Sequence, residues 1–421
     1  MRATTRNWPR IGVFIVGVVL VAGAQARGQE SLREELLKLN SATTEELQNT
    51  RLRALVKDRE KAKKAVAEAA KMVKESEDKD KPFNYNGTMI LGRAAHIVKN
   101  YDVAEKFYER QVEQATKLKS GKKILSAYDN LIDLYFDTKR YNDAVDTCEK
   151  VMDLTEPEEV LEAQPFVLER LVQAKARSGK IDEAMNIAKG IIARSGGSWY
   201  FLRLKGWLER EDGKIDESIK TYTQVLDKLD AEKTLKDEQK DRFKDGIRYT
   251  LSGLHVENKE IEKAAKQLQT LIKRNPDNPT YKNDLGFIWC DNGMNLEESE
   301  KLIREALELD KKEKKKLLDE KKIDEVKENA AYLDSMGWVL FKQKKYKEAL
   351  EYLKKSAADE DEGNHMEIWD HLADCHEALG QKQEAINAWE KALKAEDISK
   401  RDAERRRKIS AKLKTAKAAK G

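Results

Sequence analysis

The ligand-type side chains near the C-terminus are the first place in the sequence where chemistry could occur. Three of the chain's five histidines fall within residues 365–376, in the stretch HMEIWDHLADCHEALG, beside Cys375. Histidine, cysteine and aspartate are common ligands of transition metals. Successive helical residues turn by about 100°, so His371 and His376 point about 140° apart and cannot hold one ion from one helix. His371, Asp374 and Cys375 do share a face, so a metal site would need further ligands from elsewhere in the chain.

A repeating pattern accounts for the same residues without a metal. In each repeat a large residue is followed directly by a small one. About a dozen residues later, after a short turn, an Ala or Ser opens the next helix. Gly, Lys or Asn occupies the turn, as in SGKIDEA, DGKIDES, KKYKEA and LGQKQEA. Each unit is therefore expected to be two amphipathic helices joined by a tight turn. The small-residue slot of the first helix holds Gly92, Ile132, Val172, Gly206, Ser252, Gly286, Gly337 and Ala373, and the second helix opens with Ala104, Ala144, Ala184, Ser218, Ala264, Ser299, Ala349 and Ala385.

This pattern resembles the tetratricopeptide repeat, whose 34-residue consensus reads W-x2-L-G-x2-Y, then A-x3-F, then P. The last copy follows the consensus most closely, with Trp369, Leu372, Ala373, His376, Ala385, Trp389 and Ala392. About eight units cover residues 84–397, and the resemblance implies an all-α fold, a right-handed α-solenoid. His376 stands where the consensus has Tyr, so the histidine cluster is interpreted as part of the repeat. We expect no metal and no cofactor.

The physics of helix packing explains the small residues. Gly or Ala is needed where the first helix crosses its partner closely, because a longer side chain would hold the two axes apart. One helix pair cannot bury its own apolar faces, so neighbouring pairs must stack to form a continuous core. The resemblance therefore predicts stability that is shared between adjacent repeats.

The N-terminus has the layout of an export signal. Three arginines in MRATTRNWPR precede the apolar run IGVFIVGVVLVAGA and two small-x-small sites that end at residue 26. This order predicts a signal peptide over residues 1–26 and a periplasmic or secreted protein. An uncleaved anchor is the alternative, and the absence of a nearby Cys disfavours a lipoprotein.

Four further segments flank or interrupt the array. Residues 27–83 are expected to be a charged helical segment, with capping boxes at Ser31 and Thr43 and with Leu32, Leu36 and Leu47 packing on the first repeat. Helical insertions are expected at 229–244 and 311–328. Residues 398–421 carry a basic C-terminal helix or tail, with ten basic residues against two acids between 400 and 420. This tail is either a solvating end helix or a contact for anionic lipid, nucleic acid or an acidic partner.

Composition and motifs argue against an enzyme and against a nucleic-acid binder. Charged residues make up 38% of the 421 residues, yet 81 Lys and Arg nearly balance 77 Asp and Glu, so no strong field selects a nucleic acid. The sequence contains no phosphate-binding loop, dinucleotide fingerprint, HExxH helix or nucleophile elbow. The three cysteines lie far apart within helical patterns and are expected to be buried thiols.

Ligands of tetratricopeptide-repeat proteins are usually held in a concave groove lined by the first helix of each pair. The residues that the resemblance places in this groove, aromatic in the middle and acidic towards the C-terminus, are Phe166, Tyr200, Arg203, Trp207, Tyr249, Asn283, Phe287, Asp334, Trp338, Phe341, Asp370 and Asp374. Such a wall fits a protein segment with apolar anchors and a basic end.

The C-terminal repeats look like those of exported bacterial adaptors that organise proteins in the cell envelope. The first hypothesis is therefore a non-catalytic exported scaffold that binds segments of envelope or secreted proteins. The alternative is an accessory subunit of a machine for polysaccharide synthesis or export, with sugar rings stacked on the groove's aromatic residues. Contact with a membrane is expected only if the signal stays uncleaved or the basic tail binds lipid.

Overall fold

The computed structural model describes residues 29–76, 82–320, 322–323, 325–359, 362–395 and 400–418. Within these ranges the regular structure is helical, without a strand, so the predicted all-α class is confirmed. None of the described helices combines the length and the apolar character that crossing a bilayer requires. The predicted signal peptide, residues 1–26, lies outside the described residues.

Eight consecutive helix pairs make up most of the described chain, as the repeat pattern predicted. The first helices are α4 (Tyr85–Ile97), α6 (Gly121–Asp137), α8 (Glu158–Arg177), α10 (Trp199–Glu211), α12 (Asp237–Glu257), α14 (Pro279–Asp291), α16 (Ala330–Lys342) and α18 (Met366–Ala378). The second helices are α5 (Tyr101–Lys117), α7 (Tyr141–Met152), α9 (Ile181–Arg194), α11 (Ile215–Ala231), α13 (Ile261–Arg274), α15 (Leu296–Asp319), α17 (Tyr346–Ala357) and α19 (Lys382–Lys394).

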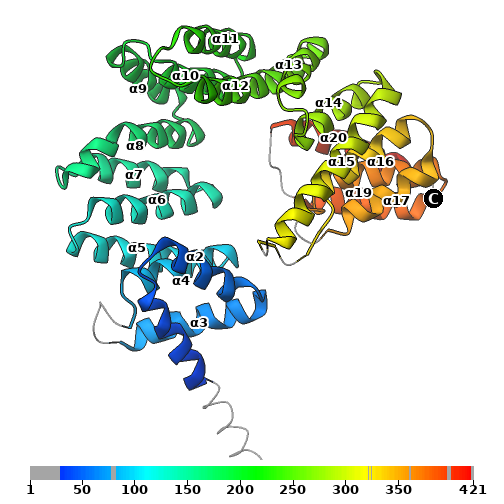
Figure 1. Cartoon of the computed structure of the whole chain (residues 1–421). Coiled ribbons are helices and arrows are strands. Elements are labelled where there is room, and N and C mark those ends of the chain that lie inside the picture. Colours follow the sequence, from blue (N-terminus) through cyan, green and yellow to red (C-terminus); the bar gives the residue numbers. More distant parts are fainter. Residues whose placement is uncertain are drawn as a thin grey trace, which may run out of the picture. The chain divides into compact units, whose positions relative to one another are not determined.

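The chain divides into two compact units between Gly196 and Gly197. Unit 1 holds the pairs from α4 to α9, and unit 2 holds those from α10 to α19 (Figure 1). Within each unit a pair packs against the next one along the chain, and neighbouring first helices also touch, as α6 touches α8 and α14 touches α16. Each unit thus has the stacked arrangement that helix-pair repeats require to bury their apolar faces.

The predicted tight turns are built on a left-handed residue. Lys139 has φ 58° and Gly213 has φ 78°, and each follows a first helix directly before its second helix begins. The next residue closes the helix end, because the backbone N–H of Arg140 donates to the carbonyl oxygen of Tyr135 at 2.8 Å. A lysine in this conformation is less favourable than glycine but sends its charged side chain into water.

The small-residue slot lies at the closest crossing within a pair. A Cβ on Gly206 would lie 2.9 Å from Cε2 of Tyr222, and a Cβ on Gly337 would lie 2.5 Å from Cγ of Leu353. In the first pair, a Cβ on Gly92 would lie 2.6 Å from Cε1 of Tyr108. The glycines are therefore required by the approach of the two helices, as the packing argument predicted.

Gly337→Ala is expected to lower the free energy of unfolding of unit 2 by about 1–2 kcal/mol, because the methyl group overlaps Leu353. Gly246→Ala is the matched control, since that glycine lies inside α12 and a Cβ there would meet nothing within 4 Å. The free energy of unfolding of the control should rise by up to about 1 kcal/mol, because Ala has a higher helix propensity than Gly. Urea unfolding of both variants checks this, and equal effects at the two positions would contradict the crossing argument.

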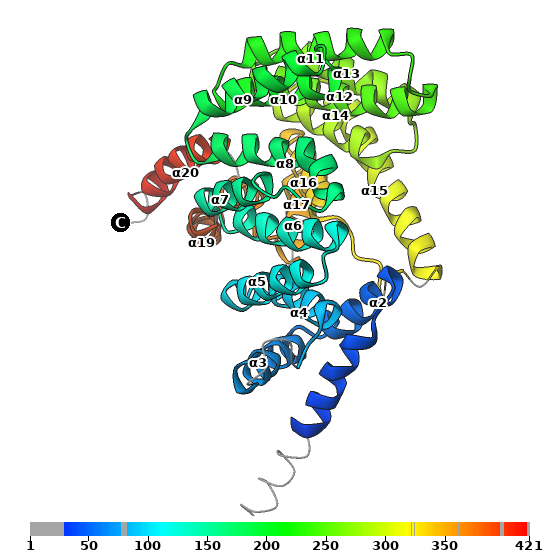
Figure 2. The same ribbon diagram turned by 90° about the vertical axis from the view of Figure 1, so that its left-hand side faces the viewer.

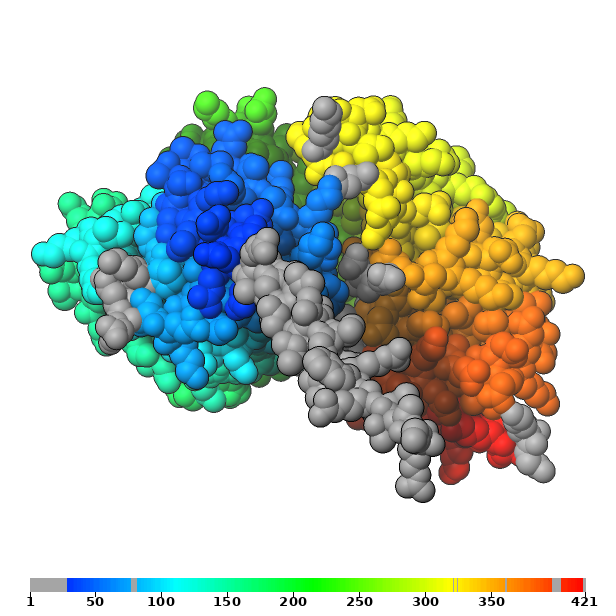
Figure 3. Space-filling model, turned by 90° about the horizontal axis from the view of Figure 1, so that it is seen from below, coloured from blue at the N-terminus to red at the C-terminus, as the bar shows by residue number. Residues whose placement is uncertain are grey.

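The segment before the array packs against the first pair. Residues 29–37 are helical, followed by η1 (Lys38–Ser41), α2 (Glu45–Val56) and α3 (Arg59–Glu75). Leu36 is buried, and Leu32 and Leu47 pack against the same core. The Asn40 amide oxygen accepts the backbone N–H of Asn84 at 3.0 Å. Figure 3 views the molecule from the end of unit 1 where α2 and α3 lie, in blue, against α4.

The capping and insertion predictions need correction. Ser31 lies inside a helix, and the cap of α2 is Thr44, whose hydroxyl accepts from Leu47 N at 3.3 Å. Residues 232–236 interrupt the predicted helical insertion 229–244, because the Glu232 carboxylate caps the backbone N–H of Thr234 at 2.9 Å.

The second insertion, 311–328, is helical only up to Asp319, the end of α15 (yellow in Figure 2). Residues 325–329 are not helical, and Lys314 Nζ donates to the carbonyl oxygen of Lys327 at 2.9 Å. The chain therefore returns along α15. This part of the sequence lacks the apolar face that would stabilise a longer helix.

The basic C-terminal segment forms α20 (Lys400–Ala418), which packs on α19 and α18. Ile409 is buried, with Leu413 and Ala416 packed around the same core. α20 thus contacts the preceding pair in the way that the first helix of a further repeat would.

Candidate binding groove

Two cavities adjoin along the first helices of unit 2. The larger measures about 550 Å³ and is lined by α14, α16 and the start of α18. The smaller measures about 340 Å³ and is lined by α10, α12 and α14. Asp284 and Phe287 of α14 line both cavities, so together the cavities form one groove. This groove is called the unit 2 groove below.

Hydroxyl groups and aromatic rings shape the middle of the unit 2 groove. The hydroxyl of Tyr249, a residue 40% exposed, donates to Asp284 Oδ2 at 2.6 Å. The Tyr249 ring lies 5.6 Å from that of Tyr281. Thr280 and Tyr332 share a hydrogen bond of 2.9 Å between their hydroxyls. Large apolar surface and fixed polar groups alternate here, as is typical of ligand grooves.

A buried cluster lies beside this groove. His371 Nδ1 is 3.0 Å from both carboxylate oxygens of Asp334, and the His371 ring stacks on Trp338 at 3.9 Å. Burial lowers the pKa of His371, but the Asp334 carboxylate raises it more, so the pKa lies above its ordinary value. Trp338 is only 7% exposed, stacks on Phe341 at 4.9 Å and donates its indole N–H to Asp291 at 3.1 Å.

The acidic residues of α18 are paired with α20. Lys412 Nζ lies 2.9 Å from Asp370 Oδ1 and 2.7 Å from both carboxylate oxygens of Asp374. Arg405 pairs with Glu367 of the same helix. Burial lowers the pKa of Lys412, but the two carboxylates outweigh it, so its pKa lies above the ordinary value. The acidic end of the predicted wall is therefore occupied by the chain's own basic helix.

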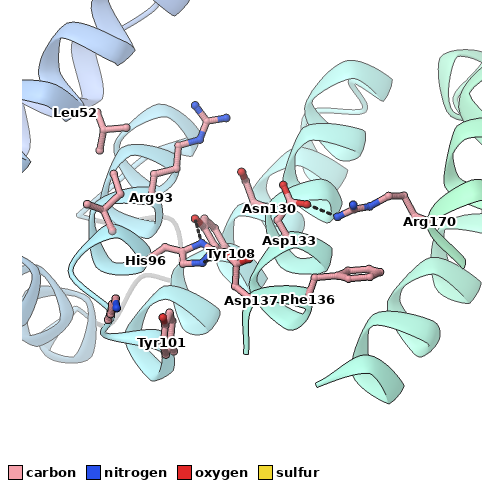
Figure 4. Close-up of a pocket in the computed structure, with 12 residues that line it drawn as sticks. Leu52, Arg93, His96, Tyr101, Tyr108, Asn130, Asp133, Phe136, Asp137 and Arg170 are labelled. Atoms are coloured by element: carbon pink, nitrogen blue, oxygen red, sulfur yellow. Dashed lines mark hydrogen bonds and ion pairs between the residues drawn. The ribbon is translucent and has the colours of Figure 1, made fainter. Parts of the chain in front are cut away.

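Unit 1 has a cavity of its own, of about 780 Å³, on the first helices of its pairs (Figure 4). His96 Nε2 lies 2.9 Å from Asp137, and the His96 Nδ1 lies 3.4 Å from the Tyr108 hydroxyl. Arg170 pairs with Asp133 and lies 4.6 Å from the centre of the Phe136 ring. Both acids of this cavity are paired with basic groups, and Arg93 and Lys99 also line it, so it presents a mixed surface.

The predicted groove residues fall into five groups. Tyr249, Asn283, Phe287 and Asp334 line the unit 2 groove. Trp338 and Phe341 stack on each other, and Asp370 and Asp374 bind Lys412. At the start of unit 2, Trp207 is partly exposed and the Arg203 guanidinium lies 4.3 Å from the Tyr200 ring centre. Phe166 belongs to unit 1 and is 62% exposed. Their roles in binding stay predictions.

The cavities also include residues that the sequence reasoning missed. Asp284 in unit 2, and Asn130 and Arg170 in unit 1, line cavities without having been predicted. Each stands two positions before a small-residue slot, at Gly286, Ile132 and Val172. This position faces the preceding repeat, where Asp284 contacts Tyr249, Arg170 contacts Asp133 and Asn130 contacts Gln111. Its regular recurrence in the repeats was the signal available in the sequence.

The histidine cluster is resolved into separate contacts. His371 binds Asp334, and His376 Nδ1 lies 2.5 Å from the Gln381 side-chain oxygen. Cys375 donates to the carbonyl oxygen of Tyr346 at 3.3 Å. Among the described residues, no three His, Cys, Asp or Glu side chains are placed to hold a metal ion. Cys148, Cys290 and Cys375 are free buried thiols, and burial raises their pKa to about 12, 12 and 11.

Parts of the chain are similar to known proteins. A family model described as anaphase-promoting complex, cyclosome, subunit 3 matches residues 316–392. Over 108 residues the chain is 30% identical to the TPR repeat-containing protein PA4667 of Pseudomonas aeruginosa. That match covers 26% of this chain and only 16% of the relative's length.

Two solved structures are similar at low sequence identity. A tetratricopeptide repeat protein from Parabacteroides merdae is 13% identical with a TM-score of 0.46, over 72% of this chain and 98% of that one. BtubC from P. vanneervenii is 20% identical with a TM-score of 0.37, over 54% of this chain and 90% of that one.

The helix pairs that stack within each unit, with their small-residue slots at close crossings, define a repeat protein of the α-solenoid class. The pattern of those slots is the pattern of the tetratricopeptide repeat, and the described helix pairs are similar to the repeats of that family. Such repeat arrays are protein-interaction modules.

Proposed function

We propose that this protein is a non-catalytic, exported adaptor that holds a segment of an envelope or secreted protein in the unit 2 groove. The observation that carries the proposal is the pair of adjoining cavities, about 340 and 550 Å³, which meet at Asp284 and Phe287. An extended polypeptide needs such a continuous, partly apolar groove rather than one enclosed pocket. The exposed ring of Tyr249 and the neighbouring Phe287 supply apolar anchor points.

The proposed export rests on the N-terminal sequence, where three arginines precede an apolar run and two small-x-small sites. The non-catalytic character is supported by the cysteines, because a buried thiol with a pKa of about 11 or 12 supplies no thiolate nucleophile near neutral pH.

The polysaccharide alternative has less support, because it needs aromatic rings with an open face. Trp338, one of the predicted groove aromatics, is buried and stacks on His371 and Phe341. A protein segment that uses Phe287 and Tyr249 as its apolar contacts needs no such platform.

Site-directed photo-crosslinking in cells tests the groove. The photoreactive amino acid p-benzoylphenylalanine replaces Phe287, and the control position is Leu318 near the end of α15, which is 36% exposed. Crosslinks from position 287 are expected to reach defined segments of exported proteins, and the control is expected to give none of these products. Phe287→Ala should weaken binding of a synthetic peptide copy of the crosslinked segment by about thirtyfold, since a central anchor contributes roughly 2 kcal/mol.

Two results would contradict the proposal. The first is a set of crosslinked segments that is identical at positions 287 and 318. The second is full affinity of the folded Phe287→Ala variant for the crosslinked segment. The export step is checked separately by the intact mass of the processed protein, which should lack residues 1–24 or 1–26.

A further inference from the structure

Asp284 is a carboxylate without a counter-charge at the centre of the unit 2 groove. The Tyr249 hydroxyl donates to its Oδ2 at 2.6 Å, and the Asn283 side-chain nitrogen donates to its Oδ1 at 3.3 Å. Both donors are neutral, and no Lys, Arg or His of the described chain pairs with this carboxylate. Burial raises the pKa of Asp284, and the two hydrogen bonds only partly offset this rise.

The other acidic residues around the larger cavity differ from Asp284 in this respect. Asp334 has His371 as its partner, and Glu367 has Arg405. Glu362 also lines this cavity, but it lies in the loop before α18 and is exposed, whereas Asp284 lies on α14 between the two cavities. Among the residues that line this cavity, His365 is the only basic one, and no lysine or arginine is present. The larger cavity therefore presents net negative charge, and Asp284 stands where it meets the smaller one. The smaller cavity adds one cation, Arg210, which is paired with Glu257.

Asn283 adds a second, independent signal. Its side chain is only 5% exposed and lines the larger cavity, yet its Oδ1 accepts no hydrogen bond from any described group. The bond from its side-chain nitrogen to Asp284 fixes the orientation of the amide. A buried acceptor without a donor costs about 1–3 kcal/mol, and a ligand that brings a donor removes this cost.

We propose that Asp284 and Asn283 together receive the cationic end of a lysine or arginine side chain that belongs to the bound protein segment. The ammonium or guanidinium group donates to the Asp284 carboxylate and to Asn283 Oδ1. Its apolar stem lies along Phe287, which lines both cavities. This inference rests on the proposed function and specifies what the groove selects.

The chemistry of the site favours a cation over a neutral donor. A charge-assisted hydrogen bond is roughly twice as strong as a neutral one. The bond to Asp284 is strengthened further because the carboxylate is partly buried, where the dielectric constant is lower than in water. A neutral donor such as glutamine would satisfy Asn283 but would leave the charge of Asp284 without compensation. Selectivity for a cation is therefore expected even among segments with the same apolar residues.

The test uses a displayed library of random dodecapeptides, panned on the immobilised full chain. Selected sequences are expected to share one lysine or arginine at a fixed spacing from an apolar residue. In a synthetic peptide of this kind, arginine is replaced by citrulline, or lysine by acetyl-lysine. This change should weaken binding to the wild-type chain at least tenfold, measured by isothermal titration calorimetry.

The decisive comparison is a double-mutant cycle with Asp284→Asn, which keeps an oxygen that can accept from Tyr249. The affinities of this variant for the neutral and the cationic peptide should differ by less than twofold. Asp227→Asn is the matched control, since it makes the same change in net charge at an exposed position of α11. The control should retain the full tenfold discrimination.

Equal discrimination by the wild type and Asp284→Asn would overturn the cation site. If Phe287→Ala nevertheless abolishes binding of the selected peptides, the proposed function stands and only this inference fails. If panning yields no peptide that Phe287→Ala weakens, the groove itself is the wrong surface and both proposals fail. Thermal unfolding of each variant confirms that the folded protein is being compared.

Discussion

Trp338→Ala is expected to lower the free energy of unfolding of unit 2 by about 3–5 kcal/mol, the usual cost of truncating a buried tryptophan. The side chain is 7% exposed, stacks on His371 at 3.9 Å and belongs to the core of the C-terminal repeats. Its loss leaves a cavity between α16 and α18 that neighbouring side chains only partly fill. Asp291 loses the indole donor at 3.1 Å, but this residue is exposed and water replaces the bond.

Because stability in a repeat array is largely shared between neighbours, the loss should concentrate near the substitution. Hydrogen exchange of the full chain should show faster opening in α14 to α19 and unchanged protection in α4 to α9. Trp338→Phe is the control, because it keeps most of the ring volume and loses mainly a hydrogen bond, at a cost of about 1 kcal/mol. Unchanged protection of α16 and α18 in Trp338→Ala would show that the ring is not part of the core.

This expectation changes how binding experiments on the groove are interpreted. The sequence pattern placed Trp338 on the partner-binding wall, and the structure places it against the protein's own His371 and Phe341. A loss of binding in Trp338→Ala would therefore report local unfolding. Phe287 and Asp284 are the better positions for testing the groove, because both line the cavities directly.

The fold was predictable because its rules are local and repeated. Ile132 and Val172 are large for the small-residue slot, which made those two repeats the most divergent. Sixteen residues later, where other repeats have Tyr222 or Leu353, these two have Cys148 and Ala188. A large residue on the first helix is thus matched by a small one on the second, and the volume at the crossing is conserved.

The groove was less predictable because its properties depend on residues that are distant in sequence. Asp370 and Asp374 were expected to be available to a partner, yet Lys412, about forty residues later, binds both. Asp284 and Asp334 are both acidic and both line the same cavity, but only Asp334 has a cationic partner, His371. These pairings cannot be read from the pattern of a single repeat. They determine which carboxylates remain available to bind a partner.

Lys412→Met is expected to destabilise unit 2 by on the order of 2 kcal/mol. Removing one partner of a buried ion pair typically costs about 3–5 kcal/mol, and this figure is reduced here because solvent screens a lysine side chain that is 33% exposed. The variant leaves two carboxylates close together without their shared cation. Lys408→Met is the matched control on the same helix, since within the described chain Lys408 pairs with Glu404 alone and both side chains are mostly exposed. The control should change stability by less than about 0.5 kcal/mol.

The pH dependence of this loss separates charge from packing. Burial and the charge of Asp370 hold the pKa of Asp374 above its ordinary value, and Lys412 acts to lower it. Without Lys412 the pKa of Asp374 rises further. A carboxyl group whose pKa is higher in the folded state contributes stability that is present at low pH and lost as the pH rises through that folded pKa. The gap between Lys412→Met and the wild type should therefore be larger at about pH 8 than at about pH 5, measured from urea unfolding midpoints. A gap that does not change with pH would mean that Lys412 stabilises α20 through its alkyl chain, and that the two aspartates do not depend on its charge.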